Sequence, residues 1–243
     1  MHHGSFSSGT ATETLERINE RLLAAKHTIQ KTDYLILTFG TSWVYRLKES
    51  NEVVSNCHKL PQKEFNRTRL EVEEIVNSYQ HFLQQLFSFN PRCKVIFTVS
   101  PIRHIKDGLH GNQLSKAILL LAIDKLCELF PEKVFYFPSY EIMMDELRDY
   151  RFYADDMVHP SSLGVRYIWE RFAEACFSRQ TQNIIKEYQS IHKSLSHDPF
   201  ESGLAAHKSF LEQLVLKINR FREKYPNLDV KKELERCHIL LER

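Results

Sequence analysis

Apolar residues recur along the chain in two patterns, one with helical spacing and one of short uninterrupted runs. Leu15, Ile18, Leu22 and Ile29 lie at helical spacing within residues 13–30, which predicts an amphipathic helix. Runs too short for a helix and closed by glycine or proline predict buried strands, and they cover residues 33–40, 94–100 and 134–137. Longer periodic segments predict further helices at about residues 70–89 and 112–129.

Strands that alternate with long helices indicate βαβ units and a parallel sheet. Residues 44–47 and 53–56 flank a turn-rich segment and predict a β-hairpin. Beyond residue 160 the pattern is almost wholly helical and is interrupted at residues 194–200. The helices predicted there cover residues 161–176, 179–193, 204–224 and 229–242. We therefore expect an α/β domain over residues 1–177, and a helical extension packed on it over residues 178–243.

Polar segments follow each predicted strand, at the edge where open parallel sheets bind their ligands. These segments are Gly40-Thr41-Ser42, Ser100-Pro-Ile-Arg-His104 and Pro138-Ser139. Arg103, His104 and Lys106 either bind an anionic group of a substrate or form a solvated basic loop. Asn112 either contacts substrate or caps the helix that begins there.

Composition narrows the class of protein. The 243 residues are 42% hydrophobic and 12% aromatic, which is enough for a substantial core. Thirty-three Lys and Arg against 31 Asp and Glu give a formal charge of +2, which argues against a general nucleic-acid binder. No run approaches the roughly 18 apolar residues of a membrane helix, and the N-terminus does not read as a secretory signal. We expect a cytoplasmic protein that binds neither membrane nor nucleic acid.

The five cysteines indicate neither a disulfide framework nor a metal site. They are odd in number, widely scattered and form no Cys-x-x-Cys pair. No Cys or His pair has the spacing of metal ligands, so we expect no metal and no cofactor. Cys57 and His58 are adjacent, and side chains of adjacent residues on an extended segment point in opposite directions. A nucleophilic Cys57 that uses His159 as its base is retained as an alternative.

Asp156 and His159 are the residues whose types and spacing best fit catalysis. Two residues separate them, and Pro160-Ser161 follows before a predicted helix. On such a loop the carboxylate reaches the imidazole Nδ1–H, fixes the tautomer and leaves Nε2 free as a general base. Asp-x-x-His is common by chance, and a helix cap beside a surface histidine is the competing interpretation. The position of Asp156 and His159 after the last predicted strand favours the catalytic interpretation.

Several longer segments resemble the GSCFA-domain proteins. The segments are Thr38-Phe-Gly-Thr-Ser-Trp-Val-Tyr45, Asn56-Cys-His-Lys59, Phe97-Thr-Val-Ser-Pro-Ile-Arg-His-Ile-Lys-Asp-Gly108, Asn112-Gln-Leu-Ser-Lys-Ala117 and the whole of residues 137–161. The resemblance is dense from about residue 13 to 177. It implies a bacterial protein related to the SGNH, or GDSL-like, hydrolases. That superfamily has a flavodoxin-like three-layer α/β/α fold with a parallel sheet, and it cleaves esters or acyl groups without a metal.

The resemblance also implies roles for individual residues. The closing Asp-x-x-His block of the superfamily corresponds to Asp156 and His159. Its Gly-x-Asn-Asp block, which supplies an oxyanion-hole amide, falls near Gly40, and Ser42 stands where the Asn would be. A hydroxyl of Thr41 or Ser42, or a backbone N–H, would then have to donate to the oxyanion.

The nucleophile is not evident in the sequence. The Gly-Ser-Cys-Phe-Ala motif, whose Ser matches the SGNH nucleophile, does not occur, and Ser5 has no strand before it to hold a nucleophile turn. We expect the family's first strand and its nucleophilic Ser to precede Met1. A sheet that lacks this strand has an open edge, which a homodimer could cover.

Two functions follow. One is hydrolysis of an ester or acyl group on a small-molecule or acylated carbohydrate substrate. The alternative is a binding or interaction module that keeps the hydrolase fold without its chemistry.

Overall fold

The computed structural model describes residue 6 and residues 8–54, 60–196 and 204–241. The chain divides into two compact units, Met1–Ile168 and Trp169–Arg243. The described strands all lie in the first unit, and the described part of the second unit is helical. The protein is therefore a mixed α/β chain, as the sequence predicts.

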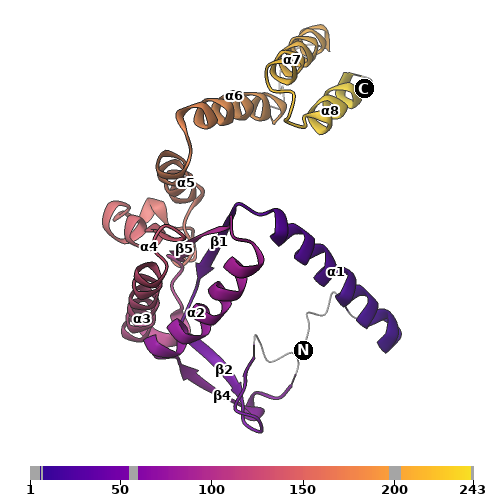
Figure 1. Ribbon diagram of the computed structural model, residues 1–243. Helices are drawn as coiled ribbons and strands as arrows, with labels where there is room; N and C mark the ends of the chain where they lie inside the picture. Colours follow the sequence, from indigo (N-terminus) through magenta and orange to yellow (C-terminus); the bar gives the residue numbers. More distant parts are fainter. Residues whose placement is uncertain (1–5, 7, 55–59, 197–203, 242–243) are drawn as a thin grey trace. The chain divides into compact units, whose positions relative to one another are not determined.

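A parallel three-stranded sheet forms the centre of the first unit (Figure 1). Its strands are β1 (Tyr34–Phe39), β5 (Lys94–Val99) and β6 (Val134–Phe137), in the order β1-β5-β6. All three were predicted as strands from their short apolar runs, and these predictions are confirmed. The expectation that they are buried holds for β5 but is wrong for β1, whose residues alternate between exposed and half-buried. Phe39 lies opposite Val99, so β1 and β5 end side by side. The residues that follow these two strands therefore meet at one edge of the sheet.

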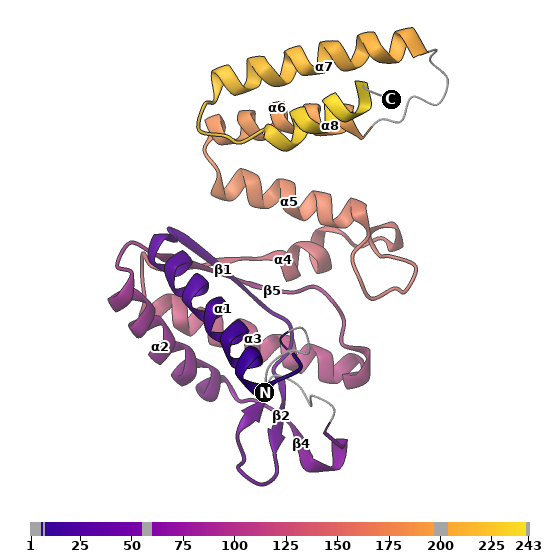
Figure 2. The same ribbon diagram turned by 90° about the vertical axis from the view of Figure 1, so that its right-hand side faces the viewer.

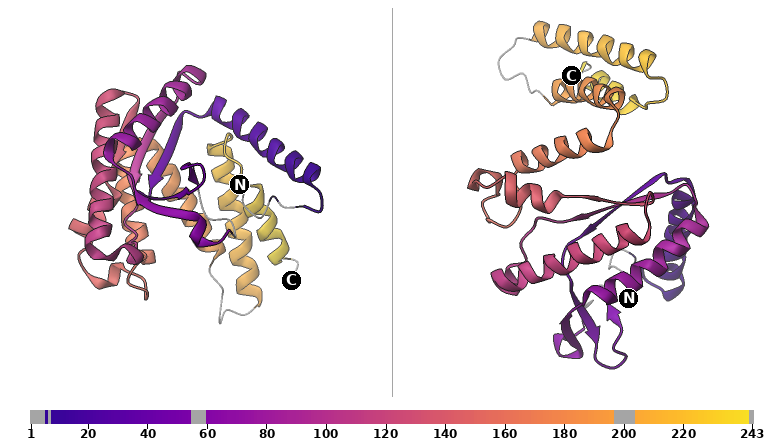
Figure 3. Two further views of the ribbon diagram at one scale, coloured as in Figure 1. Left: turned by 90° about the horizontal axis from the view of Figure 1, so that it is seen from below. Right: turned by 60° about the vertical axis from the view of Figure 1, so that its left-hand side comes forward.

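Two long helices, α2 (Val72–Phe89) and α3 (Gly108–Leu129), lie side by side over one face of this sheet (Figure 3). A capping box between Glu71 and Glu74 begins α2, since each side chain accepts a backbone N–H of the first turn. Alternate residues of β5 point at these helices and are fully buried, whereas the residues between them point at the opposite face. The core of the unit lies between α2, α3 and this face of the sheet.

The opposite face of the sheet carries a row of apolar side chains in register. Ile36 pairs with Ile96, which in turn pairs with Phe135. Ile96 is buried, but Ile36 and Phe135 are 50% and 41% exposed. A second helical layer over this face, as in a three-layer α/β/α fold, stays a prediction.

The first helix, α1 (Ala11–Lys31), is tied to the end of α2 by a single amide. The Nδ2 of Asn90 donates to the carbonyls of Ile29 and Thr32, each at 2.8 Å. Asn90 is also the residue at which α2 ends. The chain therefore enters β1 from a fixed point, which sets the position of that strand beside β5.

A second sheet is antiparallel, in the order β3-β2-β4. The predicted hairpin is confirmed as β2 (Trp43–Leu47) and β3 (Val53–Val54), with Tyr45 opposite Val54. The third strand, β4 (Phe65–Arg69), was not predicted, because its Phe-Asn-Arg-Thr-Arg sequence shows no apolar run. The guanidinium groups of Arg67 and Arg69 lie over the Trp43 ring, 4.5 and 5.9 Å from its centroid. Cation–π contact thus adds to the aromatic contact of Tyr45 with Phe65 across this pair of strands.

The second unit is built mainly from three helices, α6 (Arg179–Leu195), α7 (Leu204–Lys224) and α8 (Lys231–Leu241), which pack together (Figure 2). Their buried side chains, among them Ile191, Ile218 and Cys237, form a core of their own. A further helix, α5 (Ser162–Cys176), begins in the first unit and ends in the second. Its predicted extent is confirmed to within a residue or so. Within the described ranges, no helix has the length and apolar character needed to cross a membrane.

Short helical turns complete the first unit, and none of them was predicted. They are η2 (Gln62–Glu64), η3 (Ile105–Asp107), α4 (Ser139–Glu141), η4 (Ile142–Glu146) and η5 (Tyr150–Phe152).

Candidate active site

Asp156 and His159 form a hydrogen-bonded pair on the loop before α5. The Oδ2 of Asp156 lies 2.6 Å from Nδ1 of His159. Its other oxygen, Oδ1, accepts the backbone N–H groups of Val158 and His159, each at 2.9 Å. These bonds, from the His159 backbone first, then from the Val158 backbone and the His159 ring, lower the pKa of Asp156 to about 2. The carboxylate is therefore ionised at any pH near neutrality, as an orienting group for a histidine must be.

The loop that carries the pair is closed by its own backbone. Ala154 donates its N–H to the His159 carbonyl at 2.8 Å, and Tyr153 pairs with Pro160 as an isolated bridge. Met157, at the tip, has a φ of 58°, in the left-handed region that a long side chain rarely adopts. This turn brings His159 back over the carboxylate three residues earlier.

Gly164 allows the first turn of α5 to lie against the same loop. A Cβ at this position would be 2.9 Å from the carbonyl oxygen of Phe152, closer than such atoms approach. Two hydrogen bonds hold the same junction, since Ser161 donates its N–H to Phe152 and its hydroxyl to Arg151. The loop is therefore seated on the helix that follows it, and glycine is required for the close approach.

The residues after β1 form the part of the sheet edge predicted to receive substrate, and a serine of α3 holds them. The Oγ of Ser115 accepts the N–H of Ser42 at 2.8 Å and lies 3.1 Å from its hydroxyl. The same Oγ is 3.0 Å from Oγ1 of Thr41. Ser42 is only 1% exposed. A role for Ser42 as an oxyanion donor would require these groups to leave Ser115.

A lysine of α3 joins the ends of the two adjacent strands. The Nζ of Lys116 donates to the carbonyls of Gly40 and Ser100, each at 2.6 Å. Lys116 was not predicted as a site residue, because one lysine within a helical segment gives no signal of burial. Only the packing of α3 against the sheet places this side chain at the edge.

The loop after β5 carries Arg103 and His104. Arg103 donates to the Tyr153 hydroxyl at 2.8 Å, and its guanidinium lies 4.5 Å from the centre of that ring. Tyr153 is three residues before Asp156, so this contact links the β5 loop to the loop that carries Asp156 and His159. Arg103 forms no ion pair among the described residues, which leaves its charge available to an anionic group of a ligand.

Asn112 supports this loop from α3. Its Oδ1 accepts the His104 backbone N–H at 3.0 Å. The expectation that Asn112 caps its helix is wrong, because α3 begins four residues earlier, at Gly108. Asn112 is also buried, so its role in the structure is to fix the position of His104. Burial, followed by the charge of Lys116, lowers the pKa of His104.

The structure thus brings the three predicted segments together at one edge of the sheet. The Gly40–Ser42 turn and the Ser100–His104 loop meet at Lys116. In the third segment, Ser139 donates its hydroxyl to the carbonyl of Val99, the last residue of β5, at 2.7 Å. Arg103 also reaches Tyr153, which links the β5 loop to the loop of Asp156 and His159. In the part of the chain that the structure describes, no hydrogen bond joins the His159 ring to Gly40, Thr41 or Ser42, or to any serine hydroxyl. Ser5, Cys57 and His58 lie outside the described residues. No group of three metal-ligating side chains occurs within the described ranges.

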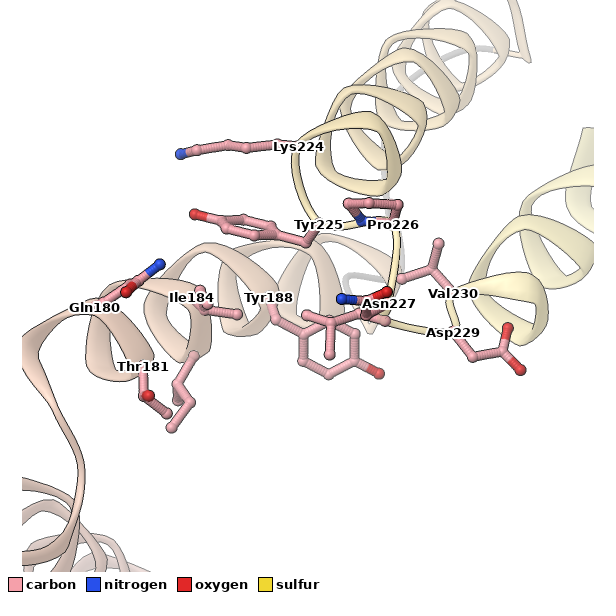
Figure 4. A pocket seen from close by; sticks show the side chains of 12 residues that line it. Gln180, Thr181, Ile184, Tyr188, Lys224, Tyr225, Pro226, Asn227, Asp229 and Val230 are labelled. Carbon is pink, nitrogen blue, oxygen red and sulfur yellow. The ribbon is translucent and has the colours of Figure 1, made fainter.

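A separate cavity of about 630 Å³ lies in the second unit, between α6 and the turn that joins α7 to α8 (Figure 4). Its walls are mainly apolar and include Ile184, Tyr188, Tyr225 and Val230. Lys224, at its rim, pairs with Glu187 at 2.6 Å. None of the predicted site residues lines this cavity. The polar side chains predicted for the site converge instead at the sheet edge of the first unit.

Comparison with known proteins gives two matches to family models. Residues 1–172 match the model described as the GSCFA family, and residues 188–243 match the one described as the GSCFA domain protein, C-terminal domain. No curated protein and no solved structure matches the chain.

Proposed function

The chain belongs to the GSCFA family, and we propose that it provides the acid–base half of an SGNH-type site for hydrolysis of esters or acyl groups. In this proposal His159 is the general base and Asp156 the carboxylate that orients it. The nucleophile is a serine outside the described residues. The substrate is a small acylated molecule, such as an acylated carbohydrate.

The hydrogen bond of 2.6 Å between Nδ1 of His159 and Oδ2 of Asp156 carries this proposal. An ionised carboxylate at this distance keeps the proton on Nδ1, so the lone pair lies on Nε2. Both side chains are about half exposed, so Nε2 can be reached by a substrate and by a second catalytic group. If Asp156 only capped the loop, the two backbone N–H groups that its Oδ1 accepts would be sufficient. The contact of Oδ2 with the His159 ring would then have no purpose.

The reaction follows from these positions. The serine hydroxyl gives its proton to Nε2 of His159 as its oxygen attacks the acyl carbon. The imidazolium then returns the proton to the leaving alkoxide, and water repeats the sequence to release the acid. Negative charge develops on the acyl oxygen, and a cation or N–H donor must lie beside it. Arg103, linked to the loop of the pair through Tyr153, is our proposed contact for this oxygen or for an anionic group of the substrate.

The test is labelling of the protein, purified from its native cells, with a fluorophosphonate, which reacts with activated serines. We expect stoichiometric labelling, and sequencing of the labelled peptide will identify the nucleophile. His159→Ala should slow labelling by a factor of about 10²–10⁴, the usual contribution of a general base. His110→Ala is the matched control, since His110 lies exposed at the start of α3. Equal rates for His159→Ala and the native protein would rule out the catalytic assignment.

A second function, a binding module without catalysis, is favoured by one observation. Among the described residues, no serine hydroxyl contacts the His159 ring. Under this alternative, a fluorophosphonate leaves the native protein unlabelled, and its intact mass is unchanged after treatment. Labelling at any serine whose rate depends on His159 excludes it.

A further inference from the structure

Lys116 is a charged side chain in an unusual place. It is 1% exposed and projects from the middle of α3 toward the sheet edge. Removing an ammonium group from water is costly unless hydrogen bonds or an opposite charge replace the solvent. No carboxylate pairs with Lys116 among the described residues. Within the described ranges its hydrogen bonds go to main-chain carbonyls, and the position of these carbonyls indicates why a charge is retained there.

The two carbonyls that it contacts end two adjacent strands. Gly40 is the residue after β1 and Ser100 is the residue after β5. Each carbonyl oxygen lies 2.6 Å from Nζ. The backbone ladder between the two strands ends with the N–H of Ser100, which donates to the Phe39 carbonyl at 2.8 Å. Beyond this point the chain leaves the sheet in two directions, toward β2 and toward Arg103. The ammonium adds one further link, between the Gly40 and Ser100 carbonyls, where the ladder stops.

The residue next to Lys116 holds the turn that follows Gly40. Ser115 receives the N–H of Ser42 and contacts the Thr41 hydroxyl, and it too is 1% exposed. Two consecutive residues of α3 therefore fix the end of β1, the end of β5 and the turn between β1 and β2. Because α3 is a rigid helix packed on the core, these contacts set the geometry of the sheet edge.

His104 shares this site with Lys116. A Cβ placed on Gly40 would lie 3.7 Å from Nε2 of His104, so the ring is in contact with the same residue that accepts from Lys116. The loop of His104 is held by Ser100 on one side and by Asn112 on the other. Lys116 therefore fixes one end of the segment on which His104 lies.

We propose that Lys116 is the positioning residue of this site, and that its ammonium fixes the carbonyls of Gly40 and Ser100 so that the Thr41–Ser42 turn and the His104 loop keep their geometry. Its burial excludes contact with substrate, so it acts through these two segments. The inference rests on the proposed function, since it assigns Lys116 a role in that site. Its test uses no enzymatic activity, so the two proposals can fail separately.

The groups around Lys116 determine which side chains respond when its ammonium loses a proton. Tyr140 faces it from α4, with Nζ 5.8 Å from the ring centre, and His104 faces it from the β5 loop. Arg67 and Asp107 act on His104 in opposite directions and form an ion pair with each other. Burial lowers the pKa of Lys116 to about 8. Above that pH the amine still donates hydrogen bonds, but it has lost the charge that strengthens them and that disfavours protonation of His104.

The experiment is an NMR titration of the full chain with ¹³C-labelled lysine and histidine. We expect one lysine side chain to titrate near pH 8, well before the others, and the amide signals of Thr41 and Ser42 to shift with the same midpoint. In Lys116→Met this lysine signal should disappear and the midpoint of the His104 ring should rise. Lys116→Arg, which keeps the charge, should leave the His104 midpoint low. Lys125→Met, on an exposed position of the same helix, is the control and should change neither.

Two results would overturn the proposal. One is a titration of the native protein in which the amide signals of Thr41 and Ser42 do not move with the midpoint of any lysine signal, and this can be recorded even if Lys116→Met does not fold. The other is a folded Lys116→Met variant in which the amide signals of Thr41 and Ser42 and the ring of His104 keep their native positions and midpoints. Absence of fluorophosphonate labelling in the native protein, together with the expected NMR results, would instead count against the hydrolase function alone.

Discussion

The carboxylate of Asp156 binds the ring of His159 through one oxygen and the backbone N–H of the same histidine through the other, at 2.6 and 2.9 Å. One side chain thus fixes both the position of the residue and the orientation of its ring. The third bond, from the N–H of Val158, closes the turn around the carboxylate. Loss of this one side chain should therefore disturb the loop and the histidine together.

Replacement of Asp156 by Asn should separate the two roles of the carboxylate. The amide oxygen can still accept backbone N–H groups, but the negative charge that stabilises the imidazolium is lost. We expect fluorophosphonate labelling to slow by about 10²–10⁴-fold, with the fold intact by circular dichroism. Asp155→Asn is the control, because the carboxylate of this exposed neighbour accepts no hydrogen bond among the described contacts. A rate equal to that of the native protein would show that Asp156 only caps the loop.

The hydrogen bonds that Asp156 accepts should persist to an unusually low pH. The pKa of Asp156 falls from 3.8 to about 2 on folding, so its contribution to stability is complete above pH 3.8 and is lost as the pH falls through 2. We expect the amide signals of Val158 and His159 to shift with a midpoint near pH 2 in an NMR titration. In Asp156→Asn this transition should be absent. A midpoint near 3.8 in the native protein would mean that the three hydrogen bonds are not formed in solution.

Gly164→Ala should displace the site loop from α5. The added methyl group would lie 2.9 Å from the carbonyl oxygen of Phe152, and backbone must move to relieve this contact. We expect a loss of about 1–3 kcal/mol in the free energy of unfolding, measured by urea denaturation. Hydrogen exchange of the Ser161 amide, which donates to Phe152, should become faster.

Gly111→Ala is the matched control for this change. Its added methyl group would make an ordinary contact of 3.5 Å with the Asp107 side chain. Because alanine favours a helix over glycine, we expect this variant to be unchanged or more stable by up to about 1 kcal/mol. A comparable loss in both variants would show that the effect at Gly164 does not come from the close approach to Phe152.

The second unit offers a test of its own core. Ile218 is fully buried among the side chains of α6, α7 and α8, whereas Leu216, two residues earlier on α7, is 50% exposed. Ile218→Ala should destabilise this unit by about 2–5 kcal/mol through lost burial and a cavity. Leu216→Ala should change its stability by less than about 0.5 kcal/mol. Urea unfolding of the full chain, followed by helical circular dichroism, measures both, and similar losses would mean that the helices pack in another way.

The local pattern of apolar and polar residues was sufficient to predict most of the secondary structure. Apolar runs closed by glycine or proline predicted β1, β5 and β6, and helical spacing predicted the long helices. β4 was missed because Phe65 is its only buried residue, while Arg67 and Arg69 lie over Trp43, and arginines in a strand resemble a solvated segment. The start of α3 was placed four residues late, since Asn112 reads as a cap although its side chain serves the neighbouring loop.

By itself the sequence determined the α/β class, the parallel alternation of strands and helices, and the Asp156–His159 pair, because each depends on residues close together in the chain. Tertiary structure alone decided which distant residues meet. Ser115 and Lys116 follow Gly40 by more than seventy residues, and only the packing of α3 on the sheet turns a serine and a lysine toward the strand ends. A hydrogen bond between such segments leaves no periodic trace in the sequence, since its geometry depends on the whole fold between them.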